Sequence, residues 1–148
     1  MGNTVVFNEE KKPNNKEKKE VVDFLHRHLD EFGDASEDIE RALKYAVKDA
    51  PSFGGFVLVE YEENMIAGAV IVNETGMSGY IPENILVYIA VNREMRGKGL
   101  GKKLMDKAVE LAKGDVALHV EADNPAVKLY EKVGFTNKYL EMRYAKKH

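Results

Sequence analysis

The strongest constraint on the fold is a strand-to-helix transition beyond the middle of this 148-residue chain. Residues 85–91 (ILVYIAV) form an unbroken apolar run, which is typical of a strand buried on both faces of a sheet. Residues 96–103 (RGKGLGKK) follow and contain three alternating glycines. A helical repeat of apolar residues then runs from Leu100 to Ala112. The sequence therefore predicts a buried strand that turns through glycines into an amphipathic helix.

The glycine-rich turn has the chemistry of an anion site. Glycine has no Cβ, so backbone N–H groups can approach a ligand closely, and the first turn of a helix has unpaired N–H donors with a partial positive charge. Phosphate is the usual ligand of such a turn. Arg96, Lys98, Lys102 and Lys103 add positive charge to a chain whose formal net charge is −3. The alternative is a tight turn with solvated lysines, but such a turn rarely needs three alternating glycines.

Two familiar nucleotide-binding motifs do not fit this turn. A dinucleotide-binding G-x-G-x-x-G that starts at Gly97 would need a sixth-position glycine where the chain has Lys102. A P-loop would need glycine where the chain has Arg96, and Ser or Thr where it has Lys103. A nucleotide-binding domain is therefore the weaker interpretation of the turn.

Apolar periodicity predicts the remaining elements. Helices are expected over residues 16–32, from Asp34 to Pro51 with Asp34 and Glu37 as a capping pair, and from Asn124 to Gly134. Strands are expected over residues 4–7, 56–61, 65–72, 116–120 and 139–145. The predicted order is β, α, α, β, β, β, α, β, α, β. This order indicates an α/β (α+β) fold, a mixed sheet with helices packed on it, in a single domain over residues 1–148.

The composition excludes several kinds of chemistry. The sequence has no cysteine, which excludes disulfides, thiolate metal sites and a covalent cysteine nucleophile. No set of His, Asp and Glu has metal-ligand spacing, and no G-x-S-x-G motif supports a serine triad. No apolar run approaches the ~20 residues of a membrane helix, and the N-terminus lacks the layout of a secretion signal. We therefore expect a cytoplasmic protein with no bound metal and with no nucleic-acid or membrane partner.

Two motifs together resemble those of the GCN5-related N-acetyltransferase (GNAT) family. Residues 96–101 (RGKGLG) match the family's [RQ]-x-x-G-x-[GA] pyrophosphate-binding motif. Residues 124–135 (NPAVKLYEKVGF) resemble its N-x-x-A-x-x-L-Y-x-x-x-G-F signature, with Val127 at the alanine position. The resemblance covers nearly the whole chain, although the final hairpin is abbreviated. It implies the acyl-CoA N-acyltransferase fold, a mostly antiparallel sheet with a central parallel strand pair and about four flanking helices.

The resemblance also implies acetyl-CoA as the co-substrate and a site for it. The pyrophosphate of the cofactor would lie on the backbone amides of residues 97–101, and its pantetheine arm would pair with the strand end at residues 89–91. Asn124 matches an asparagine that often contacts the arm, and Tyr130 matches the family's proton donor to the departing thiolate. The implied cofactor-binding residues are Ile89, Ala90, Val91, Arg96, Gly97, Lys98, Gly99, Leu100, Gly101, Lys102, Asn124 and Tyr130.

Acetyl transfer to an amine needs an acid and a base. A phenol of pKa about 10 can protonate a thiolate of pKa about 8.5 as it forms, so Tyr130 suits the acid, although its spacing from Ala126 and Val133 also suits a core residue. A lysine-like amine must lose a proton before it attacks, which at pH 7 costs roughly 4.6 kcal/mol. Glu83 is the first candidate for the base and Glu121 the second, with a solvated surface role as the alternative for each.

The resemblance further implies direct transfer of acetyl to a primary amine of a small molecule or peptide, in a ternary complex. In the family, the segment between the first two helices often lines the acceptor site. Here that segment is acidic, so it could attract a cationic amine or simply be solvated. Its acidic residues are Asp30, Glu31, Asp34, Glu37 and Asp38. A non-catalytic acyl-CoA sensor with the same fold is the alternative function, and such folds commonly form homodimers.

Overall fold

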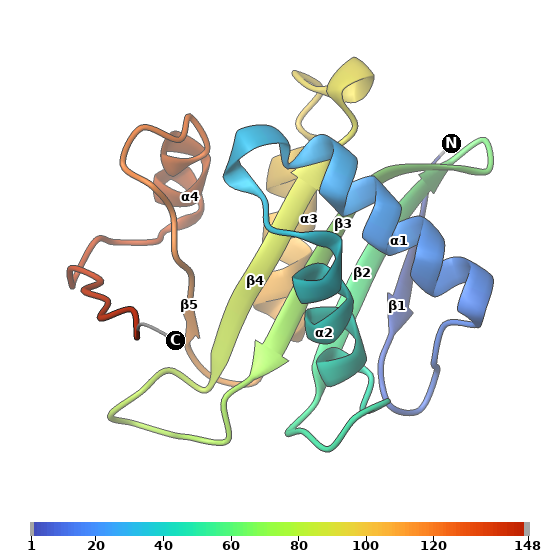
Figure 1. Cartoon of the computed structure of the whole chain (residues 1–148). Coiled ribbons are helices and arrows are strands. Elements are labelled where there is room, and N and C mark those ends of the chain that lie inside the picture. Colours follow the sequence, from blue (N-terminus) through green and yellow to red (C-terminus); the bar gives the residue numbers. More distant parts are fainter. Residues whose placement is uncertain (1, 147–148) are drawn as a thin grey trace.

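A five-stranded sheet in the order β1-β2-β3-β4-β5 forms the centre of the computed structural model, which describes residues 2–146 (Figure 1). The first four strands are antiparallel neighbours, whereas β4 and β5 run parallel. The strands are β1 (Gly2–Phe7), β2 (Gly55–Glu62), β3 (Met65–Glu74), β4 (Asn84–Val91) and β5 (Val116–Ala117). This mixed, mostly antiparallel sheet confirms the predicted fold class.

Helices cover both faces of the sheet. Helices α1 (Asn15–His28) and α2 (Ser36–Ala46) lie on one face, and α3 (Leu100–Leu111) lies on the other (Figure 1). A short helix, α4 (Val127–Val133), packs beside α3, and single 3₁₀ turns occupy Asp30–Phe32 and Arg93–Met95. No helix within residues 2–146 combines the length and the apolar character that crossing a membrane would require.

Two apolar layers, one on each face of the sheet, make up the core. On the first face, Val21 and Leu25 of α1 and Leu43 of α2 are buried against β2 and β3. On the second face, Leu104 and Met105 of α3 are buried against the same strands. Coverage on both faces explains why the apolar runs of the central strands barely alternate with polar residues. Burial of each of these side chains contributes about 1.5–3 kcal/mol.

Helix α1 begins at a capping box that holds its first turn. The Oδ1 of Asn14 accepts a hydrogen bond from the backbone N–H of Glu17 at 2.8 Å, and the Oε1 of Glu17 accepts one from the N–H of Asn14 at 2.8 Å. The helix ends at His28, earlier than the predicted end at residue 32. Asp30 adopts a left-handed φ of +58°, which interrupts the α-helical hydrogen bonding there.

The predicted cap of α2 by Asp34 and Glu37 is wrong. Ala35 is the N-cap residue of this helix, and no side chain caps it. Asp34 instead accepts a hydrogen bond from the hydroxyl of Tyr88, on β4, at 2.5 Å. The two residues are 54 positions apart in the sequence, and local spacing cannot reveal so distant a partner.

Three other elements are shorter than predicted. Helix α4 begins at Val127, with Ala126 as its N-cap residue, and not at Asn124. Helix α2 ends at Ala46 and stops short of Pro51, because Lys48 adopts a left-handed φ of +59° and turns the chain. Strand β5 ends at Ala117 rather than at residue 120. Element types are therefore correct in all three places, whereas the boundaries depend on how the chain turns to reach the next element.

The predicted final strand over residues 139–145 does not form. These residues belong to no helix or strand, and the side chains of Leu140 and Met142 are 84% and 90% exposed. Their alternation with polar residues is typical of a strand, but a strand also needs backbone hydrogen-bond partners. The edge of the sheet on this side is β5, which is only two residues long. The parallel pair therefore lies at the edge of the sheet rather than in its centre.

We expect Asn14→Ala to lower the free energy of unfolding by about 1 kcal/mol, because the N–H of Glu17 loses its acceptor. Asn15→Ala is the matched control, since it makes the same change at an exposed position just inside the helix. The control should alter stability by less than about 0.5 kcal/mol. Urea denaturation followed by circular dichroism measures both variants. Equal effects would show that the capping box does not stabilise α1.

Candidate active site

Strand β4 loses its second neighbour soon after it begins. It pairs with β3 over its whole length, but with β5 only through Asn84↔Val116 and Ile85↔Ala117. Figure 1 shows the chain after β5 turning away from β4 toward α4. Residues 86–91 therefore have one backbone edge that no strand within residues 2–146 occupies. A free edge of extended backbone can accept another extended chain by strand addition.

A bulge makes β4 irregular along this free edge. Ile71 of β3 faces Tyr88, whereas the next residue, Val72, faces Leu86, so β4 contains one extra residue between them. Bulges of this kind re-aim side chains and are common beside active sites. Here the Tyr88 hydroxyl reaches Asp34 in front of the sheet. Burial, and then the hydrogen bond to Asp34, raises the pKa of the Tyr88 phenol.

The glycine turn follows β4 directly and is open to solvent. Gly97 and Gly99 adopt left-handed φ values of +84° and +79°. A Cβ at either position would meet nothing within 4 Å, so the backbone conformation, and not a lack of space, favours glycine there. Gly99 is the N-cap of α3, and no side chain caps this helix. The first N–H donors of α3 are therefore available to an anionic ligand.

Gly101 has a different role, which is packing. A Cβ at this position would lie 3.2 Å from Leu129 Cδ2, on α4, and 3.8 Å from Val91 Cγ2, at the end of β4. The absence of a side chain thus lets α4 approach the first turn of α3. This contact brings the helix that carries Tyr130 beside the glycine turn.

The three lysines of the turn differ in their partners. Lys102 forms an ion pair with Asp106 at 2.7 Å on the exposed surface of α3. Lys103 forms one with the buried Glu60 of β2 at 3.1 Å. Lys98 is exposed, and no ion pair within residues 2–146 involves it. A hollow of about 690 Å³ begins at the turn and continues along α3, so an anion could approach this positive charge from solvent.

Arg93 and Arg96 bind the end of α1 rather than pointing freely into solvent. The guanidinium of Arg96 donates to the carbonyl of His28 at 2.9 Å, and that of Arg93 donates to the carbonyl of Arg27 at 2.8 Å. Both arginines also pair with Asp30. The backbone N–H of Arg93 donates to Nδ1 of His28 at 3.3 Å. Burial, and then the charge of Arg93, lowers the pKa of His28, which favours the neutral ring that can accept this bond.

No sequence pattern signals this arginine cluster, because its hydrogen bonds join residues 63 to 68 positions apart. Arg96 was expected to add positive charge to the anion site. Its guanidinium is instead engaged on two sides, since its Nε also donates to the carbonyl of Val91 at 3.2 Å. The side chain therefore holds the turn against β4 and α1.

Tyr130, the expected proton donor, lies on α4 with 8% of its surface exposed. Its ring is tilted against Phe135, with centroids 6.1 Å apart, and it packs in the same apolar layer as Leu104 of α3. Burial raises the pKa of this phenol, so it keeps its proton at neutral pH. No hydrogen bond within residues 2–146 uses the hydroxyl. The ring is thus part of the core, while the hydroxyl stays available as a donor.

Asn124 shapes the turn that leads into α4. Its Oδ1 accepts a hydrogen bond from the N–H of Ala126 at 2.9 Å, and its carbonyl accepts one from the N–H of Val127 at 3.1 Å. The predicted contact with the pantetheine arm would therefore come from the side-chain amide N–H groups of Asn124. At the other end of the helix, Gly134 adopts a φ of +120° and ends α4 as expected.

Glu83, the first candidate for the general base, is bound to loop backbone. Its Oε1 accepts a hydrogen bond from the N–H of Asp115 at 2.6 Å, and its Oε2 accepts one from the N–H of Gly79 at 3.0 Å. These two bonds lower the pKa of the carboxyl. Glu83 directly precedes β4, whereas the glycine turn follows the other end of this strand, roughly 25 Å away at ~3.3 Å per residue. Both carboxylate oxygens of Glu83 therefore already accept backbone hydrogen bonds, and its catalytic role stays a prediction.

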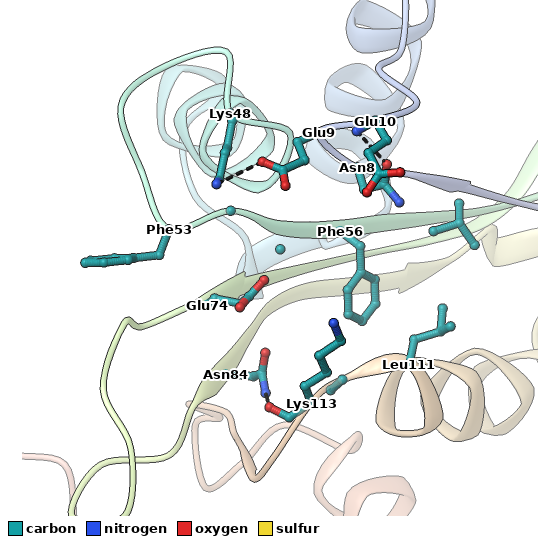
Figure 2. A pocket seen from close by; sticks show the side chains of 14 residues that line it. Asn8, Glu9, Glu10, Lys48, Phe53, Phe56, Glu74, Asn84, Leu111 and Lys113 are labelled. Carbon is teal, nitrogen blue, oxygen red and sulfur yellow. Dashed lines mark hydrogen bonds and ion pairs between the residues drawn. The ribbon is translucent and has the colours of Figure 1, made fainter.

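A second hollow, of about 240 Å³, lies at the end of the sheet where β4 begins (Figure 2). Phe56 and Lys113 point into it, and Lys48 pairs with Glu9 at 2.8 Å on its rim. Asn84, the first residue of β4, also lines it, so this hollow is separate from the glycine turn. None of the predicted cofactor residues lines it. Within the described residues, no cluster of three or more His, Asp or Glu could hold a metal ion.

Comparisons with known proteins found similar sequences and a similar fold. The N-alpha-acetyltransferase 30 of Schizosaccharomyces pombe is 26% identical over 126 residues, which are 78% of this chain and 82% of that protein. The human Cysteine-rich protein 2-binding protein is 32% identical over 105 residues, which are 70% of this chain but only 12% of that protein. The structure of aminoglycoside N-acetyltransferase AAC(6')-Iy in complex with CoA has a TM-score of 0.70 at 14% identity, and the match covers 100% of this chain and 97% of that one. This structural likeness shows a shared fold.

The family model described as "Acetyltransferase (GNAT) family" matches residues 19–135. This range contains the free edge of β4, the glycine turn and the helix of Tyr130. On this evidence, the chain belongs to the GNAT family of acetyltransferases.

Proposed function

We propose that this chain is an N-acetyltransferase that binds acetyl-CoA and passes its acetyl group directly to a primary amine. The observation that carries the proposal is the open, uncapped glycine turn beside the free edge of β4. The turn supplies N–H donors for a pyrophosphate, and the edge can pair with an extended pantetheine arm. The CoA bound by the structural neighbour AAC(6')-Iy supports this choice of donor.

The cofactor would contact two stretches of backbone and a few side chains. Residues 97–101 would receive the pyrophosphate on their N–H groups, with Lys98 and Lys102 adding positive charge from the surface. Ile89, Ala90 and Val91 would exchange hydrogen bonds with the amides of the arm, as one strand does with its neighbour. Arg96 would act indirectly, because its guanidinium already binds Val91 and His28.

In the transfer step, the leaving thiolate of CoA needs a proton. The neutral amine attacks the thioester carbonyl carbon, the C–S bond breaks, and the CoA sulfur takes the proton of the Tyr130 phenol. The raised pKa of Tyr130 keeps that proton in place until the thiolate forms. Solvent then returns a proton to the phenolate, and the amine loses its extra proton to water. Glu83 is left out of this scheme because backbone N–H groups bind both of its oxygens.

The acceptor in this proposal is a primary amine of a small molecule or a peptide. The names of two similar proteins, an N-alpha-acetyltransferase and an aminoglycoside N-acetyltransferase, each denote transfer to nitrogen. Glu31 and Asp34 lie between α1 and α2, form no ion pair within residues 2–146, and favour a cationic acceptor on electrostatic grounds. A protonated amine would be attracted to this segment and would lose its proton only on approach to the thioester.

A thermal-shift titration with acetyl-CoA, CoA, ATP and NADH tests the donor assignment. A ligand that binds only the folded state stabilises it by RT ln(1 + [L]/Kd), which is about 2.7 kcal/mol at 100 times the Kd. We expect stabilisation by acetyl-CoA and CoA alone. A larger shift with ATP or NADH, or no shift with acetyl-CoA, would contradict the proposed function.

Gly99→Asp should weaken acetyl-CoA binding at least about tenfold, because a carboxylate at the N-cap of α3 repels the pyrophosphate. Gly99→Asn is the matched control, since it adds the same bulk and the same backbone strain without charge. Both variants should fold, because a Cβ at Gly99 meets nothing within 4 Å and Asp and Asn tolerate a left-handed φ. Isothermal titration calorimetry measures both affinities. If the two variants bind equally well, the turn does not hold the pyrophosphate.

Tyr130→Phe should lower kcat at least about tenfold while acetyl-CoA affinity changes little, because only the proton donor is removed. Tyr144→Phe, at a tyrosine that is 86% exposed, is the matched control. Release of CoA is measured with spermidine, an aminoglycoside and a peptide with a free N-terminus as acceptors. An unchanged kcat would remove Tyr130 from the mechanism. Binding of acetyl-CoA without turnover of any acceptor would favour the acyl-CoA sensor.

A further inference from the structure

The hollow of about 240 Å³ at the start of β4, lined among others by Phe56, Glu74, Asn84 and Lys113, contains an unused hydrogen-bond acceptor. We call it the distal hollow. Asn84 is only 1% exposed, and its Nδ2 donates to the carbonyl of Lys113 at 2.9 Å and to that of Asp115 at 3.3 Å. Carbonyl oxygens only accept, so the amide nitrogen must face them and Oδ1 must face away.

The Oδ1 atom of Asn84 is directed into the distal hollow (Figure 2). No hydrogen bond within residues 2–146 reaches this oxygen. Every fully enclosed side-chain polar atom among the described residues has a partner, so Oδ1 must border the open space of the hollow. An acceptor in such a position destabilises the protein unless water or a ligand donates to it. This oxygen therefore marks a place for a donor group.

Two side chains of opposite charge flank the same space. Glu74 is the last residue of β3, and Lys113 follows the end of α3. Figure 2 shows the carboxylate and the ammonium group directed toward the hollow. Neither side chain takes part in an ion pair in the part of the chain that the structure describes. The distal hollow thus offers acceptors at Asn84 and Glu74 and a charged donor at Lys113.

An apolar wall completes the distal hollow. Phe56 of β2 is buried with its ring toward the hollow, and Leu111, at the end of α3, also lines it. The carbonyl end of a helix carries a partial negative charge, which adds to the attraction for a cation here. The volume of about 240 Å³ lies below the roughly 300–1,000 Å³ of pockets for drug-sized ligands, so the ligand must be small.

We propose that the distal hollow binds a small zwitterion, a free α-amino acid with an apolar side chain. The ammonium group of the ligand donates to Asn84 Oδ1 and to Glu74, and its carboxylate accepts from Lys113. Its side chain lies against Phe56 and Leu111. A simple cation would leave Lys113 without a partner, and a simple anion would leave Asn84 Oδ1 without a donor. A ligand that carries both groups satisfies all three side chains.

This site does not depend on the proposed function. The glycine turn precedes α3, whereas the distal hollow lies at the other end of this 12-residue helix, roughly 18 Å away at ~1.5 Å per residue. None of the predicted cofactor residues lines the hollow. The amino acid would therefore occupy a second site, and acetyl-CoA could be bound at the same time.

Isothermal titration calorimetry with L-leucine, leucinamide and isocaproate tests the proposal on the full chain. Leucinamide keeps the ammonium group but lacks the carboxylate, and isocaproate keeps the carboxylate but lacks the ammonium group. We expect L-leucine to bind and each of the other two to bind at least about tenfold more weakly, because each loses a charge-assisted hydrogen bond. Equal affinity for all three, or no binding of L-leucine at millimolar concentration, would overturn the proposal.

Two variants assign each charge of the ligand to its partner. Lys113→Met should weaken L-leucine about tenfold and leave leucinamide unchanged, whereas Glu74→Gln should weaken L-leucine and leave isocaproate unchanged. Both side chains are exposed, so both variants should fold. Lys44→Met and Glu40→Gln are the matched controls, since these residues pair with each other on the surface of α2, and both should bind L-leucine like the unaltered protein.

Backbone amide signals in heteronuclear NMR spectra locate the two ligands. L-leucine should shift the signals of residues 54–56, Asn84 and residues 111–113, and acetyl-CoA should shift those of residues 97–101 in the unaltered protein and in both hollow variants. Leucine-induced shifts confined to residues 97–101, or leucine affinity that neither variant alters, would overturn the second site and leave the proposed function intact. Leucine binding in the hollow without any binding of acetyl-CoA would overturn the proposed function alone.

Discussion

The pairing of β4 is the physical constraint on which the candidate site depends. A strand in the interior of a sheet normally satisfies its backbone on both edges, and β4 does so only at its first two residues. The departure of β5 leaves an extended edge free and carries the chain toward α4. That path allows α4 to pack on α3 across Gly101 and brings Tyr130 to the same end of the sheet as the glycine turn. A single break in strand pairing thus accounts for both the free edge and the position of the buried phenol.

Most of the positive side chains around the glycine turn bind other parts of the protein, whereas no side chain caps the backbone N–H groups at the start of α3. The guanidinium of Arg96 binds the protein, Lys103 neutralises the buried Glu60, and Lys102 pairs with Asp106 along α3. What the turn itself offers is N–H groups at an uncapped helix start. Such donors are held in place by the helix and lose no side-chain entropy on binding, which suits recognition of a pyrophosphate common to many CoA thioesters.

The acidic segment between α1 and α2, residues 29–35, has a structural role that its composition does not reveal. Asp30 and Asp34 have the sequence context of solvated helix-end charges, yet Asp30 pairs with Arg93 in the turn after β4, and Asp34 accepts a hydrogen bond from Tyr88 on β4. Glu83 shows the converse. It has the chemistry of a base, but its carboxylate is already bound by the backbone of two loops. In both cases the partner, and not the residue type, decides what the carboxylate can do.

The sequence by itself determined the elements whose conformation depends on residues a few positions away. These are the apolar strand of residues 85–91, whose residues alternate between buried and half-buried, the glycine turn, and the amphipathic helix that follows. Only the tertiary structure decided where β5 leaves β4, that residues 139–145 form no strand, and which partners Arg96 and Asp34 take. Periodicity and turn chemistry report local conformational preference, whereas hydrogen-bond partners more than 50 residues away are available only after the sheet has brought them together.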